Sequence, residues 1–156
     1  MRRKLPYQVG SQVLVPLSGR WARGVVARMK GRGVILGYFF GPAELTAADA
    51  PTVLDPRDAV LVCLFGHLGL PDGTWRVLGP TPGFRPDGWP VPMFGRPDSS
   101  RPHLGYVVQY GETCQVLSER FVPIADIAGL PGDGLYGSVA LERRLAFDLG
   151  IRGPAD

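Results

Sequence analysis

The stretch VGSQVLVPLSGRWARGVVARMKGRGVILGYFF, residues 9–40, decides the fold because it contains three apolar segments separated by glycine-containing turns. Apolar residues alternate with other types over 9–17 and 21–30, which is typical of strands that turn one face to a core. Residues 34–40 are continuously apolar, as in a strand that is covered on both faces. Because the two turns are short, we expect a three-stranded antiparallel meander.

The middle of the chain adds further strands. Residues 59–68 form an apolar run whose β-branched content favours a central strand, although its periodicity also fits a buried helix. A hairpin is predicted over 105–110 and 114–122, because Gly111 and Glu112 fit a two-residue turn. The minor predicted elements are a short helix over 43–50, a turn at Asp72 and Gly73, and a short strand over 75–78.

Residues 135–149 are predicted to end in a helix. Its apolar stripe repeats every four residues and consists of Leu141, Leu145 and Leu149. Ser138 is the expected N-cap, and Gly150 stands where a C′ glycine is expected. For residues 1–156 we therefore expect a single α+β domain. It combines a strongly bent, mainly antiparallel sheet or partial barrel with a C-terminal helix packed on it.

Residues 79–103 are predicted to form a proline- and glycine-rich loop, since seven of these 25 residues are proline and four are glycine. Large apolar side chains interleave the prolines, so we expect the loop to be draped over the core and pinned there. Tryptophan and arginine are enriched among interface anchors. The candidate partner contacts are Trp89, Phe94, Arg96 and Arg101. The alternative is that Trp89 folds back onto its own domain.

Positive charge gathers near the N-terminus, because residues 1–43 contain eight basic residues and no Asp or Glu. Such a balance fits a small SH3-like barrel that binds nucleic acid, or a basic strand face that is merely solvated. The residues of this candidate basic face are Arg20, Arg23, Arg28, Lys30 and Arg32.

The sequence offers no arrangement typical of a catalytic or metal site. His67 and His103 are far apart, and neither has metal-ligand spacing with Cys63 or Cys114. We expect no enzyme activity, no metal and no cofactor, and both cysteines as small buried side chains in the reduced state. A His67–Cys114 nucleophilic pair, as in a hydrolase, stays open because such residues meet only in space. No secretory signal or membrane-spanning run is seen, so the expected location is cytoplasmic.

Several segments together resemble one known family. The opening, residues 9–17 followed by a turn and residues 22–28, is an apolar strand ending in Pro-Leu and then a Gly-x-Val strand. Residues 73–79 are similar to a Gly-x-Trp-x-apolar-apolar-Gly segment, and Pro82, Pro92 and Phe94 fit the proline-rich stretch after it. Residues 136–142 resemble the start of a closing helix. In this order, the segments resemble the immunity protein 26 family of bacterial polymorphic toxin systems.

The resemblance implies a small cytoplasmic α+β protein that binds and neutralises a cognate toxin domain by direct contact. It implies no enzyme activity, and it carries over no catalytic residue. A proline-stiffened loop and a rigid scaffold are compatible with that role, because a stiff surface loses less entropy on binding than a flexible one. The sequence names neither the toxin nor the surface that contacts it.

Overall fold

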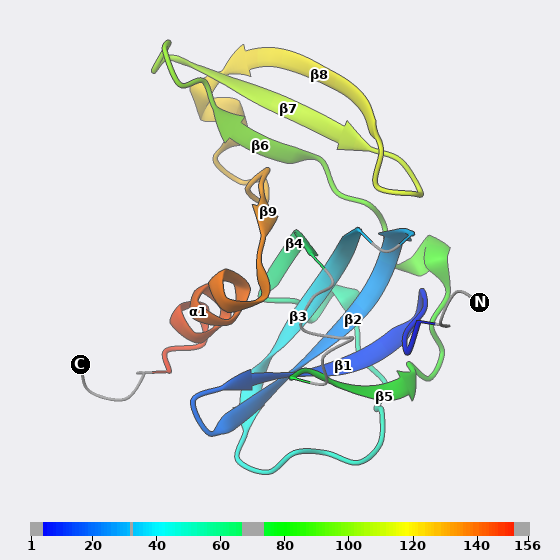
Figure 1. Cartoon of the computed structure of the whole chain (residues 1–156). Coiled ribbons are helices and arrows are strands. Elements are labelled where there is room, and N and C mark those ends of the chain that lie inside the picture. Colours follow the sequence, from blue (N-terminus) through cyan, green and yellow to red (C-terminus); the bar gives the residue numbers. More distant parts are fainter. Residues whose placement is uncertain (1–4, 32, 67–73, 152–156) are drawn as a thin grey trace.

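The computed structural model describes residues 5–31, 33–66 and 74–151, and within them the chain is an α+β protein. The larger sheet has six strands in the order β5-β1-β2-β3-β4-β9, and it is antiparallel except for the pair of β4 and β9 (Figure 1). Its strands are β1 (Ser11–Leu17), β2 (Arg20–Lys30), β3 (Val34–Glu44), β4 (Leu61–Gly66), β5 (Arg76–Pro80) and β9 (Leu135–Tyr136).

The predicted meander is confirmed by β1, β2 and β3. Two irregularities in the pairing of β2 with β3, between Trp21 and Arg23 and between Val26 and Arg28, interrupt the regular ladder, and such irregularities bend strands. The helix predicted over 43–50 is wrong, because β3 continues to Glu44, which pairs with Trp21. Helix propensity is a weak preference that pairing with a neighbouring strand overrides.

The central strand predicted within 59–68 is confirmed as β4, so the helical alternative is excluded for its described part. The short strand predicted over 75–78 corresponds to β5. The turn predicted at Asp72 and Gly73 lies outside the described residues, as do the last residues of the 59–68 segment.

A smaller sheet combines β6 (Phe94–Pro97), β7 (Leu104–Tyr110) and β8 (Val116–Pro123) in that order. The predicted hairpin is confirmed, but its connection is wider than two residues. Cys114 has a φ of 57° and β8 begins only at Val116, because a residue in that conformation does not continue a strand. In the smaller sheet, Figure 1 shows β8 as the outermost strand.

The prediction of a loop over 79–103 needs correction, because this stretch contains β6 and a turn of 3-10 helix at Pro86–Gly88. The strand fits because its only proline, Pro97, stands at its end. The rest of the stretch is pinned to the core as expected, since Trp89 and Phe94 are buried and Phe84 packs against the same cluster.

The C-terminal helix α1 (Ser138–Asp148) packs on the larger sheet. Leu141 and Leu145 are fully buried and Leu149 lies against the same core, which confirms the predicted stripe. The N-cap is Gly137 and not Ser138, which is already helical. Gly150 has a φ of 69°, as its predicted C′ position requires.

The larger sheet is covered on both faces, and β3 shows this directly. Ile35 and Phe39 belong to one cluster, together with α1 and Trp75, whereas Leu36, Tyr38 and Phe40 belong to a second. The second cluster is completed by Trp89, Phe94 and Cys114, which come from the proline-rich stretch and the smaller sheet. This double cover explains why residues 34–40 are continuously apolar.

Candidate protein-interaction surface

Two arginines and two aromatic rings form a stacked row on the smaller sheet. The guanidinium carbon of Arg96 lies 4.4 Å from the ring centroid of Tyr106, and that of Arg101 lies 4.4 Å from the ring centroid of Phe121. The Tyr106 and Phe121 rings are themselves 4.5 Å apart. Arg96 pairs with Tyr106 and Tyr106 pairs with Phe121 across β6, β7 and β8, so the three side chains share a face. We call these four residues the arginine–aromatic surface.

Carboxylates hold the first arginine of this surface in place. One terminal nitrogen of Arg96 donates to Glu119 at 3.0 Å and to Asp133 at 2.8 Å. The Tyr110 hydroxyl donates to the other oxygen of Asp133, and burial raises the pKa of Tyr110, so this phenol stays protonated. The guanidinium of Arg96 is therefore held in one position by the chain's own carboxylates.

The second arginine is anchored through a loop carboxylate. Asp98 accepts hydrogen bonds from the backbone N–H groups of Ser100 and Arg101, at 3.0 and 2.9 Å, and a terminal nitrogen of Arg101 donates to it at 3.3 Å. These bonds, first of all the one from the Ser100 N–H, hold the pKa of Asp98 well below its usual range. The carboxylate thus stays ionised and keeps Arg101 beside Phe121.

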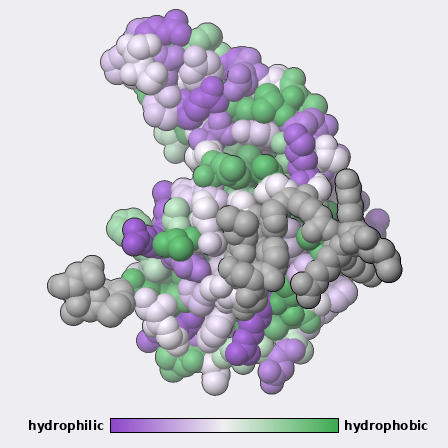
Figure 2. All heavy atoms as spheres, in the orientation of Figure 1, coloured by the Kyte–Doolittle hydropathy of each residue, from purple (hydrophilic) through white to green (hydrophobic). Residues whose placement is uncertain are grey.

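The arginine–aromatic surface is accessible and close to neutral. Phe121 is 50% exposed, and the Arg101 side chain is 48% exposed. Each arginine already faces a carboxylate, so the row carries little excess charge. Figure 2 shows the smaller sheet as a lobe that projects from the body, with hydrophobic and hydrophilic residues interleaved on the visible side. A neutral, aromatic and arginine-rich surface fits a protein partner better than a polyanion.

The four residues expected from the sequence to contact a partner divide into two pairs. Arg96 and Arg101 belong to the arginine–aromatic surface. Trp89 and Phe94 are buried, at 4% and 0% exposure, and do not present their side chains to a partner in this structure. The Trp89 ring instead packs edge-on against Tyr38, at 5.1 Å between ring centroids. The alternative in which Trp89 folds back onto its own domain therefore describes the structure.

Sequence reasoning missed Tyr106 and Phe121 as surface residues. The alternation of Tyr106 with Val108 and Tyr110 places these three side chains on one face of the strand. It does not show which of them the rest of the protein buries and which remains accessible to solvent. Phe121 becomes the neighbour of Tyr106 only through the hairpin register. That register depends on the wide connection at Cys114, which no turn motif predicts.

The expected basic face on β2 is not continuous in the described residues. Arg23 donates to Glu44 at 3.0 Å and to the side chain of Gln12 at 2.7 Å. Arg28 is buried and is bound to carbonyl groups of the proline-rich stretch. These two guanidinium groups are thus occupied internally, because both faces of β2 are covered. Arg20 and Lys30 are exposed, and Arg32 lies outside the described residues.

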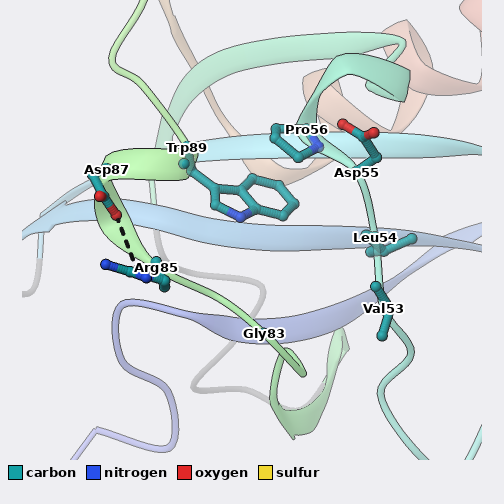
Figure 3. Close-up of a pocket in the computed structure, with 9 residues that line it drawn as sticks. Val53, Leu54, Asp55, Pro56, Gly83, Arg85, Asp87 and Trp89 are labelled. Atoms are coloured by element: carbon teal, nitrogen blue, oxygen red, sulfur yellow. Dashed lines mark ion pairs between the residues drawn. The ribbon is translucent and has the colours of Figure 1, made fainter.

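A shallow depression of about 520 Å³ lies between residues 53–56 and 83–89 (Figure 3). The Trp89 ring stands between Arg85 and Asp87 on one side and Val53 to Pro56 on the other. Arg85 and Asp87 form an ion pair at 3.6 Å, and Asp55 is bound to Arg57 outside the depression. Both carboxylates of the depression, Asp55 and Asp87, are therefore paired with an arginine close to them in sequence, and they do not point toward a common centre.

The residues considered for catalysis are placed apart from one another. His103 is exposed in the connection between β6 and β7, and His67 lies outside the described residues. Cys63 and Cys114 are free, buried thiols in different clusters. Burial raises the pKa of Cys63 to about 12 and also raises the pKa of Cys114, which disfavours the reactive thiolate at neutral pH.

The described residues contain neither a candidate metal site nor a helix that could span a membrane. No three His, Cys, Asp or Glu side chains gather there closely enough to hold a metal ion. None of the helices found there has the length and apolarity needed to cross a membrane. In the comparisons with known proteins, no family model, no curated protein and no solved structure matches this chain.

Proposed function

We propose that this chain is an immunity protein that binds a cognate bacterial toxin domain and neutralises it by direct contact. The observation that carries the proposal is the arginine–aromatic surface, which is exposed, stacked and held in place by carboxylates. The resemblance to the immunity protein 26 family supplies the class of partner. The protein works by occupying its target, catalyses no reaction and needs no cofactor.

This surface has the residue types of a binding hot spot, and its arginine side chains are already held in fixed positions. Aromatic residues and arginine carry much of the energy in protein interfaces, where they cluster near the centre. Ordering a free arginine side chain at an interface costs about 0.5–1.5 kcal/mol, and this cost falls when the side chain is already fixed. Arg96 and Arg101 are both fixed before binding, so more of the contact energy remains as affinity.

The proposal also accounts for the cysteines and the expected location. A toxin delivered into a cell is met in the cytoplasm, which is reducing, so an inhibitor there has no use for a disulfide. Cys63 and Cys114 are free and serve as apolar side chains in the two cores. Their role is packing, and the binding role belongs to the smaller sheet.

Calorimetric titration of the chain with a toxin-like domain encoded by a neighbouring gene tests this function. Phe121→Ala should weaken binding by about 30-fold or more, because a hot-spot truncation costs about 2 kcal/mol. Phe147→Ala is the matched control, since Phe147 is 81% exposed on α1 and lies outside the arginine–aromatic surface. A toxin domain that the wild-type chain does not bind, or equal affinities for both variants, would overturn the proposal.

A further inference from the structure

In the described part of the chain, the two sheets have four edge strands, which are β5, β9, β6 and β8. The first three are protected against pairing with a further strand. At β6, the Gly95 N–H donates to the Pro131 carbonyl at 2.9 Å, and the Asp133 N–H donates to the Gly95 carbonyl at 2.8 Å. At the ends of the larger sheet, β9 has only the residues Leu135–Tyr136, and β5 is short and ends at Pro80, which has no N–H.

The fourth edge strand, β8, also ends at a proline, Pro123, but it is longer than β5 and β9, and no other segment of the described chain forms backbone hydrogen bonds with residues 116–121 at its outer edge. It is eight residues long and pairs with β7 on one side only. Every residue from 116 to 121 is exposed, and the apolar side chains of Val116, Leu117 and Phe121 are 55%, 56% and 50% exposed. A long edge strand with exposed apolar side chains is a template for a further strand.

We propose that the free edge of β8 accepts an extended segment of the toxin domain as an added strand, an inference that rests on the proposed function. In strand addition, main-chain hydrogen bonds supply affinity and alternate side chains supply specificity. Phe121 belongs both to β8 and to the arginine–aromatic surface. A strand added at this edge therefore continues the same interface, and Figure 1 shows β8 as the strand beside which it would lie.

The two faces of β8 define the chemistry of the added strand. Glu119 and Phe121 lie on the face of the arginine–aromatic surface, where Glu119 is already bound to Arg96 at 3.0 Å. Arg120 alternates to the opposite face, is exposed, and has no ion-pair partner among the described residues. The added strand should therefore carry apolar side chains next to Phe121 and a carboxylate next to Arg120.

A second copy of this chain fits the edge less well. Paired residues share a face, so two-fold antiparallel pairing of β8 with its copy must place one residue opposite itself. Centring on Glu119 puts two carboxylates opposite each other, and centring on Arg120 does the same with two guanidinium groups. Like charges in that position are destabilising. Centring on Phe121 or on Ser118 leaves an overlap of only five residues, which places Pro123 opposite Glu119 in the first case and Val116 opposite Arg120 in the second.

Hydrogen exchange of the chain, free and bound to the cognate toxin domain, tests the added strand. In the complex, outward-facing amides of β8 should exchange at least about tenfold more slowly, because they gain hydrogen-bond partners. The amides of β5, at the far end of the larger sheet, are the internal control and should not change. Binding without protection of β8 would overturn this inference and leave the proposed function standing.

A charge-reversal variant gives a second measurement. Arg120→Glu should weaken toxin binding by about tenfold, because a carboxylate at that position repels the one expected on the added strand. Arg143→Glu makes the same change at an exposed position on α1 and should bind as the wild type does. Equal affinities would count against the inference, and so would a free chain that is dimeric with β8 already protected. Absence of any binding would remove the proposed function itself.

Discussion

Arg28 connects the larger sheet to the proline-rich stretch. Its terminal nitrogens donate to the Trp89 carbonyl at 3.1 Å and to the Pro86 carbonyl at 2.9 Å, and its guanidinium also binds Glu112. Both carbonyls would lose a partner if the guanidinium were removed. A basic residue that could belong to a nucleic-acid surface is thus part of the interior.

Replacing this buried arginine tests its structural role. Arg28→Met should lower the free energy of unfolding by about 2–4 kcal/mol, because the buried carbonyl groups that accept hydrogen bonds from the guanidinium would be left without a donor. Urea denaturation measures the change. Lys30→Met, at an exposed position of the same strand, is the control and should change stability by less than about 0.5 kcal/mol. Equal losses in both variants would contradict this role.

Asp98 links the order of the arginine–aromatic surface to pH. Its folded-state pKa lies below the usual value of about 3.8, so the folded chain binds this proton less readily than the unfolded chain. Its contribution to stability is therefore complete above that value and is lost as the pH falls through the folded-state pKa. Unfolding measured between about pH 6 and pH 2 should show a shallower acid loss for Asp98→Asn than for the wild type. Identical acid profiles would contradict the assignment.

At the scale of elements, α1 shows how a helix that is weakly amphipathic still anchors the fold. Leu141 and Leu145 are fully buried against the larger sheet, and the Trp75 indole N–H donates to Glu142 at 2.8 Å. The hydrogen bond ties α1 to the residue just before β5, while the leucines supply the apolar contact. Burial of one face is what makes a helix of this length stable.

Two substitutions in α1 separate packing from propensity. Leu145→Ala should cost about 2–5 kcal/mol, because it leaves a cavity in the core. Phe147→Ala, two residues further along the same helix, should change stability by less than about 0.5 kcal/mol, because its side chain is 81% exposed. Thermal unfolding of both variants measures the difference. A large loss at Phe147 would show that α1 turns a different face to the sheet.

The elements also show how far sequence reasoning reaches. The meander and the leucine stripe of α1 were predictable, because periodic apolar residues and short turns specify them locally. β6 was not, because Pro92 shortly before it and Pro97 at its end conceal a four-residue strand. Trp89 could not be assigned either, since a tryptophan among prolines fits a buried anchor and an interface residue equally well. Residue type alone indicates half of the candidate surface, namely Arg96 and Arg101.

At the scale of the whole molecule, the formal charge of +3 gives little reason to expect binding to nucleic acid. In the described residues, Arg23 and Arg28 are engaged internally, and Arg96 and Arg101 face carboxylates. The chain should therefore elute early from a heparin column at moderate salt. Strong retention that falls steeply as salt rises would favour phosphate contacts instead.

The central claim is that this chain works by covering a toxin domain with the arginine–aromatic surface of its smaller sheet. Survival of cells that co-express the chain with a toxin-like domain encoded by a neighbouring gene tests this most directly. The wild type and Phe147→Ala should protect the cells, whereas the folded double variant Arg101→Ala with Phe121→Ala should not. Full protection by the double variant, or none by the wild type, would contradict the claim.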